Sequence, residues 1–347
     1  MEAPQKLDIT NVIAGFQPPP GVVLPSLHEL VQICNGNPSG PVTGVPYPKG
    51  LAYPPGAPTI WIKHKCSPAA WHGVAAQMTA YTKLRELGSS VWVPAIYYAY
   101  EISHKWTYIV MQYVPDPNAL ALAERATTEA ERDRIWYQVA RALTDIYRIP
   151  IPNHPQPANI DGTNIVNPFF SRYQDCMAPR AYSSVAQLQQ HINKALEKMR
   201  REERVDFRDE PMIFCYCKFR HENFLIGKND LVTVVGFSET SILPSSFAAS
   251  ALTQHLDTGI TEANGRDASL IRMPYGEKTW SNMLALKQAT IPVQKYPLAF
   301  KAIGDDIAGP GEEEIDGYYT HDCPFVRIQH FANPSKFSNT GEVGWKV

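Results

Sequence analysis

The chain has 347 residues, of which 44% are hydrophobic and 19% charged, and its formal net charge is −2. A chain of this size can bury one large core or two moderate ones, whereas a charge so close to zero gives no basic field for nucleic acid. No apolar run approaches the roughly 18 residues that span a bilayer and the N-terminus lacks a signal-peptide pattern, so we expect a cytoplasmic protein with no nucleic-acid or membrane partner.

Cysteine usage indicates free thiols. Six cysteines at irregular spacing do not form a disulfide framework. Cys215 and Cys217 are separated by one residue, which is not the C-x-x-C spacing, and no second Cys or His pair lies nearby in the sequence. We therefore expect no metal and no cofactor.

The first 56 residues show one periodic segment. Residues 24–34 carry apolar side chains at helical spacing and predict an amphipathic helix. A stretch rich in Gly and Pro follows, and it contains no G-x-G-x-x-G pattern. We interpret this stretch as a surface loop or arm.

The next segment alternates strands with one helix. The predicted elements are a strand over 59–63 that ends at Lys63, a helix over 69–87, a strand over 93–97 that begins at a proline, and a strand over 108–114.

The following part is mainly helical. Amphipathic patterns predict helices over 128–147 and 185–204. The prolines of 150–157 separate them from each other, and the aromatic-rich segment 161–182 between them is predicted as a loop that could wall a substrate pocket. Residues 282–288 are predicted as helical, and the tail from Gly304 as irregular.

The stretch 211–247 carries the pattern that is most informative about function. A short apolar run (212–215) leads into a polar turn (216–223), a second apolar run (224–226), another turn and a β-branched strand (232–235). That strand ends at Gly236-Phe237-Ser238.

Two short strands around a loop that ends in Asn223, followed by a strand that ends in x-Phe-x, resemble the catalytic and metal-binding loops of kinases. The resemblance is to the fungal aminoglycoside-phosphotransferase-like family and covers about residues 60–249. It implies an α+β fold of two lobes, a small β-rich N-lobe and a larger, mostly helical C-lobe. The implied domains are a poorly defined arm over 1–56, an N-lobe over 57–116, and a C-lobe over 117–347 that includes the irregular tail.

The residues that carry the family's chemistry are replaced. The family pattern is His-Gly-Asp-x-x-x-x-Asn, with a further Asp at the end of the next strand. Here Asn223 matches, whereas Tyr216, Cys217 and Lys218 stand for His, Gly and the base Asp, and Gly236 stands for the metal-binding Asp. A charged Lys cannot accept a proton and repels magnesium, and Gly offers no side-chain ligand. The resemblance therefore implies a degenerate member.

Lys63 resembles the phosphate-pairing Lys of the family. Its usual partner is a Glu on the next helix, but Ala75, Ala76 and Gln77 stand near the expected place. The ion pair that would hold Lys63 on a phosphate is therefore missing, and a solvent-facing or pocket-lining Lys is an equal alternative.

Three functions are compatible with these residues. In the first, the cleft between the lobes binds a small apolar metabolite of secondary metabolism and converts it by acid/base chemistry, through cyclisation, isomerisation or dehydration. The catalytic candidates are Lys218, Tyr216, His221, Glu222 and Glu239, and the substrate-binding candidates are Lys63, Asn223 and Phe237.

In the second, the protein is an ATP-dependent small-molecule kinase in which Glu222 and Glu239 take over metal binding. In the third, it is a pseudokinase-like binding module without turnover. Equally open is a salt bridge from Lys218 to Glu222 or Glu239 in an inactive site.

Overall fold

The computed structural model describes residues 8–35, 50–66, 68–104, 106–153, 155–254 and 271–307. The chain divides into two compact units. The first takes in the described residues up to Trp71 together with Ala95–Val114, and the second takes in His72–Pro94 and the described residues from Pro115 onward.

The first unit is built on an antiparallel sheet of five strands in the order β1-β5-β6-β3-β2. The strands are β1 (Ile9–Ala14), β2 (Leu51–Tyr53), β3 (Ile60–Cys66), β5 (Ile96–Ile102) and β6 (Trp106–Gln112). In β3, Ile60 and Ile62 are fully buried, whereas Trp61 between them and Lys63 after them are half-buried and belong to the other face. This alternation explains why the segment forms a strand with one core face.

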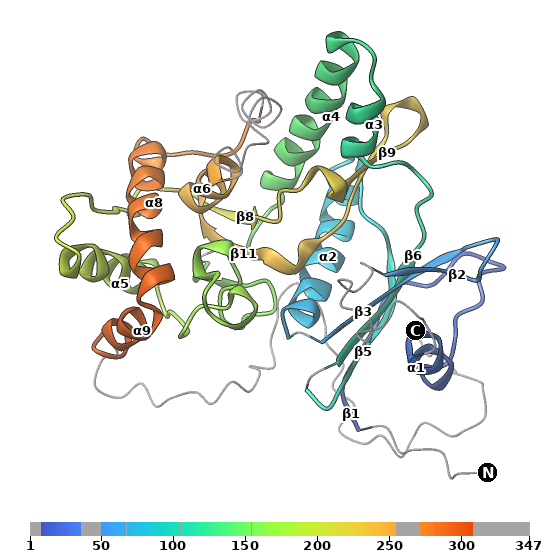
Figure 1. Ribbon diagram of the computed structural model, residues 1–347, viewed down its shortest axis with the longest axis horizontal. Coiled ribbons are helices and arrows are strands. Elements are labelled where there is room, and N and C mark those ends of the chain that lie inside the picture. The colour runs from blue at the N-terminus through green and yellow to red at the C-terminus, as the bar shows by residue number, and fades with distance from the viewer. Residues whose placement is uncertain are drawn as a thin grey trace. The chain divides into compact units, whose positions relative to one another are not determined.

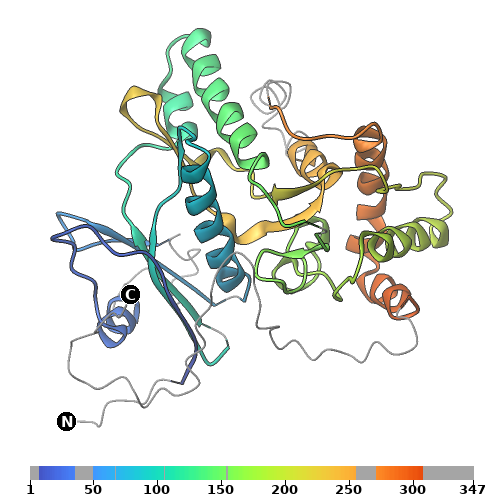
Figure 2. The ribbon, with the colours of Figure 1, turned by 180° about the vertical axis from the view of Figure 1, so that it is seen from behind.

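Helix α1 (Leu27–Asn35) belongs to the same unit and lies beside the sheet in Figure 2. It begins after Pro25 with a reciprocal cap, in which the Ser26 backbone N–H donates to Glu29 Oε2 (2.7 Å) and the Glu29 N–H donates to Ser26 Oγ (3.3 Å). Leu30 is fully buried, and the Tyr98 hydroxyl donates to the Pro25 carbonyl. The residues expected to form an arm therefore include part of this sheet and its helix.

The second unit is mostly helical, with two small sheets. The sheets have the orders β4-β10-β9 and β7-β11-β8. Their strands are β4 (Val91–Trp92), β7 (Ala158–Asn159), β8 (Met212–Tyr216), β9 (Phe224–Ile226), β10 (Val232–Val234) and β11 (Thr240–Pro244). The helices are α2 (Pro68–Glu86, in this unit from His72), α3 (Ala119–Arg125), α4 (Glu129–Tyr147), α5 (Val185–Lys198), α6 (Ser245–Gln254), α8 (Thr279–Lys295) and α9 (Pro297–Asp305). Single 3₁₀ turns are η2 (Pro168–Phe170), η3 (Gln174–Cys176), η4 (His221–Asn223), η5 (Lys228–Asp230) and η6 (Phe237–Glu239).

The helices of the second unit enclose the central strands. Helix α8 packs against α5, α6 and α9, and both α4 and α6 contact β8 (Figure 1). Helix α4 begins where Thr128 caps it, with the Thr128 side chain accepting from the Glu131 N–H and the Glu131 carboxylate accepting from the Thr128 N–H. The predicted α+β class, with a strand-rich part and a mostly helical part, is confirmed.

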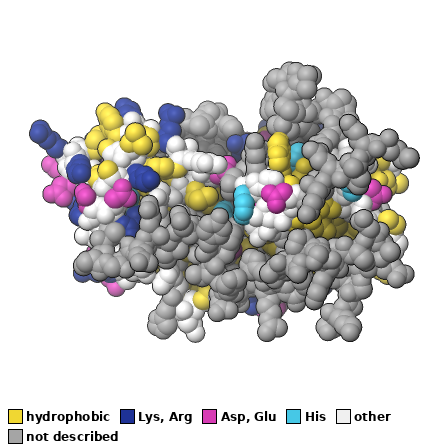
Figure 3. Space-filling model, turned by 90° about the horizontal axis from the view of Figure 1, so that it is seen from below, with side chains coloured by type: hydrophobic (Ala, Val, Ile, Leu, Met, Phe, Trp, Pro, Cys, Tyr) yellow, Lys and Arg dark blue, Asp and Glu magenta, His cyan; other side chains and the backbone are white. Residues whose placement is uncertain are grey.

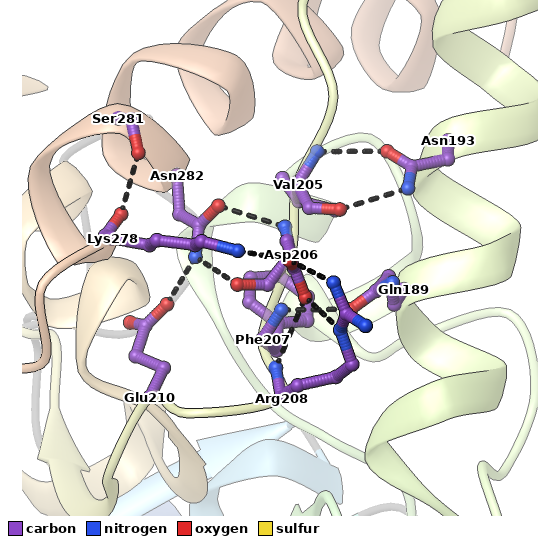
Figure 4. A network of polar contacts seen from close by, with 10 residues as sticks. All are labelled: Gln189, Asn193, Val205, Asp206, Phe207, Arg208, Glu210, Lys278, Ser281 and Asn282. Atoms are coloured by element: carbon purple, nitrogen blue, oxygen red, sulfur yellow. Dashed lines mark hydrogen bonds and ion pairs between the residues drawn. The ribbon is translucent and has the colours of Figure 1, made fainter.

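A polar network holds the segment that leads into β8 (Figure 4). The Asp206 N–H donates to Asn282 Oδ1 (2.8 Å), and Asn282 Nδ2 donates to the Asp206 carbonyl (2.7 Å) and to Glu210 Oε2 (2.6 Å). On the other side, Asn193 exchanges hydrogen bonds with the backbone of Val205 (2.8 and 2.9 Å). Helices α5 and α8 therefore fix the approach of the chain to β8.

Several predicted elements have different bounds. The strand expected over 93–97 begins only at Ile96, because Pro94 has no N–H to pair. The helix expected over 185–204 ends at Lys198, where the N–H groups of the next residues fold back onto carbonyls of the last turn and Arg200 adopts a left-handed conformation (φ +54°). The helix expected over 282–288 is longer, Thr279–Lys295.

The tail expected to be irregular from Gly304 is helical at its first two residues. Gly304 lies in α9, and the part of the tail from residue 308 lies outside the described residues.

None of the helices in the described part of the chain combines the length and the apolar composition that a membrane crossing requires. On the face shown in Figure 3, the described charged side chains of both signs lie interspersed with hydrophobic ones, in keeping with the small net charge.

Candidate functional site

The candidate site forms where two loops of the second unit run side by side. One loop follows β8, and the other is the 3₁₀ turn η6 between β10 and β11. The Cys217 N–H donates to the Glu239 carbonyl (3.0 Å), which continues the pairing of Tyr216 with Thr240 in the β8–β11 ladder. This pairing places the side chains of Lys218 and Glu239 next to each other.

Lys218 is bonded to both neighbours on η6. Its Nζ donates to Glu239 Oε1 (2.8 Å) and to Ser238 Oγ (2.9 Å). The Lys218 and Glu239 side chains are 21% and 22% exposed, so solvent or a ligand reaches both of them. Of the two salt bridges considered from the sequence, the one to Glu239 is formed. In this pair Lys218 Nζ is the donor and the Glu239 carboxylate is the acceptor.

Asn223 and Gly236 hold the backbone of the loop that carries Lys218. Asn223 Nδ2 donates to the Lys218 carbonyl (2.8 Å), and the Val235 N–H donates to the Asn223 carbonyl (2.9 Å). Gly236 has φ +86°, and a Cβ placed there would lie 2.8 Å from Asn223 Nδ2. A side chain at position 236 therefore conflicts both with the backbone conformation and with the bracing amide.

Tyr216 at the end of β8 and Phe237 in η6 pack against each other beside the two loops. Both are buried, with ring centroids 5.2 Å apart in an edge-to-face arrangement. The Tyr216 hydroxyl donates to the Val235 carbonyl (2.9 Å). Burial raises the pKa of Tyr216 well above its usual range, opposed by a side-chain hydrogen bond with Asn223. The role of Tyr216 in acid/base chemistry stays a prediction, which this environment does not favour.

The remaining candidates lie in different surroundings. His221 is 6% exposed and packs between the rings of Trp136 (4.3 Å) and Phe219 (5.3 Å), while Glu222 is half-buried on the same 3₁₀ turn. Lys63 belongs to the first unit, where it is half-buried on β3 opposite Ile109. Gln77, which stands near the place of the family's helix Glu, donates to the Pro94 carbonyl (2.9 Å).

A buried ion pair that the sequence did not reveal lies beside η6. His72 Nδ1 is 2.7 Å from Asp161 Oδ2, and Thr163 donates to Asp161 through its N–H (3.0 Å). Burial raises the pKa of Asp161, but the charge of His72 and the hydrogen bonds from His72 and Thr163 outweigh it, so the pKa lies below its usual value. The next residue, Gly73, packs closely against η6: a Cβ at position 73 would lie only 2.9 Å from Ser238 Cα.

Cys176 lies within electrostatic reach of Lys218 and Glu239. Burial raises the pKa of its thiol to about 11; the Glu239 carboxylate adds to this rise, and the Lys218 ammonium opposes it. Cys176 and the preceding Asp175 both have left-handed backbone conformations (φ +60° and +56°). The thiol is therefore a neutral neighbour of the site at ordinary pH.

The ligand chemistry of the two loops does not fit magnesium. Magnesium takes oxygen ligands, typically carboxylates, whereas Lys218 presents an ammonium and Gly236 presents no side chain. The carboxylate of Glu239 is already paired with Lys218. Among the described residues, no group of three or more His, Cys, Asp or Glu side chains is arranged to hold a metal ion.

Comparison with known families identifies the family of this chain. Residues 66–244 match the profile described as the phosphotransferase enzyme family, which is more than half of the 347 residues. The chain belongs to the phosphotransferase enzyme family. The match spans both loops of the candidate site and ends at the last residue of β11.

Solved structures of aminoglycoside phosphotransferases are similar at low identity. The gentamicin–APH(2")-IIa complex is 12% identical, with 82% of this chain and 96% of that chain covered and a TM-score of 0.42. APH(4)-Ia is 12% identical over 72% and 87% of the two chains, with a TM-score of 0.40. APH(3'')-Id from Streptomyces rimosus, in complex with ADP and streptomycin, is 13% identical over 67% and 87%, with a TM-score of 0.37. No curated protein matches the chain.

Proposed function

We propose that this member of the phosphotransferase family no longer transfers phosphoryl groups. In its place, the Lys218 site binds a small apolar metabolite and converts it by acid/base chemistry, as in a cyclisation, an isomerisation or a dehydration. The observation that carries the proposal is the 2.8 Å contact of Lys218 Nζ with Glu239 Oε1, at the place where the family pattern has its base Asp.

Phosphoryl transfer needs two kinds of functional group that these loops lack. A carboxylate must orient the attacking hydroxyl, and oxygen ligands must hold magnesium on the phosphates. Lys218 stands at the position of the base Asp, and Gly236 at that of the metal-binding Asp. The positive φ of Gly236 and the closeness of Asn223 both disfavour a side chain at position 236. The alternative kinase with relocated acids would require Glu239 as a ligand, but Lys218 already neutralises that carboxylate.

The Lys218 ammonium can act as a proton or hydrogen-bond donor. It has three N–H groups, of which Ser238 and Glu239 take two. The third can be directed at a carbonyl or a leaving hydroxyl of a small molecule, and the one-fifth exposure of the side chain gives such a molecule access. The Glu239 carboxylate then accepts the proton that the substrate loses in the conversion and passes it to Lys218, which restores the pair.

Thermal unfolding with and without ATP tests the loss of phosphoryl transfer. A ligand that binds only the folded state raises the unfolding temperature by mass action, by the equivalent of about 2.7 kcal/mol at 100 times its Kd. We expect millimolar ATP with MgCl₂ to cause no rise beyond that seen with MgCl₂ alone. A rise that depends on magnesium and saturates with ATP would overturn the proposal.

A variant series separates the causes of such a result. Lys218→Asp restores an acid at the base position, and we expect it still to show no magnesium-dependent rise, because Gly236 supplies no ligand. Lys228→Asp, an exposed change outside the site, is the matched control for the added charge. If Lys218→Asp alone restored ATP binding, the missing magnesium ligand at position 236 would not be the obstacle that we assign to it.

A further inference from the structure

Three polar atoms of the site stand in a chain. Ser238 Oγ lies 2.9 Å from Lys218 Nζ, which lies 2.8 Å from Glu239 Oε1. Ser238 is 5% exposed, and its backbone is held between the fixed turn at Gly236 and the paired Cys217–Glu239 backbone. The hydroxyl therefore has one defined neighbour that handles protons, and this neighbour has a carboxylate behind it.

This order of groups is the arrangement that activates a hydroxyl. A nucleophile within hydrogen-bond reach of a base, with a third group that orients the base, is the general signature of covalent catalysis. Serine–lysine pairs and serine–lysine–carboxylate sets recur in acyl-transfer enzymes of unrelated folds. We propose that Ser238 is the nucleophile of this site, and that its substrates are esters or activated acyl compounds.

Sequence spacing hides this set, because Lys218 comes from the loop after β8 whereas Ser238 and Glu239 come from η6. The β8–β11 ladder brings the two loops together, and Gly73 of α2 closes against Ser238 Cα, where any larger residue would collide. The hydroxyl is therefore fixed by the backbones of α2, β8 and β11 rather than by a flexible surface loop, as a preorganised nucleophile requires.

The proton balance of the step uses only these groups. The Glu239 carboxylate is the final acceptor of the Ser238 proton. As Ser238 Oγ bonds to the acyl carbon, its proton passes to Lys218 Nζ while Lys218 passes one of its own protons to Glu239, and the bond from the acyl carbon to the leaving group breaks. The leaving group takes a proton from the pair, and water later cleaves the acyl-Ser238 ester to give the free acid.

The inference deepens the proposed function and rests on it, because it keeps Lys218 and Glu239 as the proton-handling pair and names the group that reacts. It specifies the acid/base chemistry of that site as acyl transfer to Ser238, with esters or activated acyl compounds as the substrate class. Its failure would leave the loss of phosphoryl transfer untouched, since that claim is tested by magnesium-dependent ATP binding.

A serine-directed fluorophosphonate probe tests the inference without a known substrate. In the adduct, Ser238 Oγ bonds to phosphorus, fluoride leaves, and the proton passes to the Lys218–Glu239 pair. We expect one adduct on the intact full-length chain, mapped by peptide mass spectrometry to Ser238. Because a positioned base contributes about 100-fold or more, Lys218→Met and Glu239→Gln should each slow labelling by about that factor.

Two further variants complete the design. Ser171→Ala removes an exposed hydroxyl outside the site and should label at the wild-type rate. Ser238→Cys keeps the size of the side chain and should lose the fluorophosphonate adduct while the protein stays folded by circular dichroism. The inference is overturned if the folded chain forms no adduct, if the adduct maps elsewhere, or if Ser238 is labelled equally fast in Lys218→Met.

Discussion

Gly236→Ala tests whether the position of the family's metal-binding acid can still accept a side chain. A non-glycine residue in the left-handed region costs about 1 to 2 kcal/mol. The added Cβ would also lie 2.8 Å from Nδ2 and 2.9 Å from Cγ of Asn223, an overpacking that typically costs about 1 to 3 kcal/mol. We therefore expect a loss of roughly 2 to 5 kcal/mol in unfolding free energy.

Urea denaturation measures this loss, and a matched glycine separates its two causes. Gly88 lies in the same unit with φ +63°, and nothing within 4 Å would meet a Cβ there. Gly88→Ala should therefore lose only the backbone part, about 1 to 2 kcal/mol. The reasoning is refuted if Gly236→Ala costs no more than Gly88→Ala. In an Asn223→Ala background, Gly236→Ala should cost less than it does in the wild type, because the colliding amide is absent, although Asn223→Ala itself loses the bond to the Lys218 carbonyl.

Two further predictions concern buried carboxylates. Glu210 accepts from Asn282 Nδ2 in the network of Figure 4, and it also accepts from the Ser246 N–H. Glu210→Gln should therefore cost about 2 to 4 kcal/mol by urea denaturation, since buried donors lose their acceptor. The exposed change Glu203→Gln should cost almost nothing, and equal costs would contradict this role. Asp161 has a folded pKa below its ordinary value of 3.8, so the stability it contributes is present above that value and is lost as the pH falls through the folded pKa. As the pH falls below 3.8, wild-type unfolding midpoints should fall more steeply than those of Asp161→Asn, and parallel curves would refute the assignment.

The elements that could be predicted from the sequence are those specified by local patterns. The start of α4 follows from the capping pair of Thr128 and Glu131 ahead of an amphipathic run. Strands β8, β9 and β10 follow from short apolar runs separated by polar turns. The early end of α5 was missed, because it depends on the left-handed conformation of Arg200, a residue with no local signal for that conformation.

The contacts that define the site were less accessible, because they join segments far apart in the sequence. Glu222 and Glu239 were equal candidates as partners of Lys218, and the β8–β11 register decides for Glu239. His72 and Asp161 are 89 positions apart, and no local pattern links them. Ser238 was read only as the end of a strand, since its role depends on a neighbour brought in by β8.

The loop that carries Lys218 is held by groups other than the Lys218 side chain, and this explains how a family scaffold can keep its shape with different chemistry. Asn223 bonds to the Lys218 carbonyl, and the Cys217 N–H bonds to the Glu239 carbonyl. Both contacts involve only the backbone at positions 217 and 218, so they are compatible with an acid or a base at 218. Fold and family membership therefore leave the reaction open, and the side chains of Lys218, Ser238 and Glu239 determine which chemistry the site can perform.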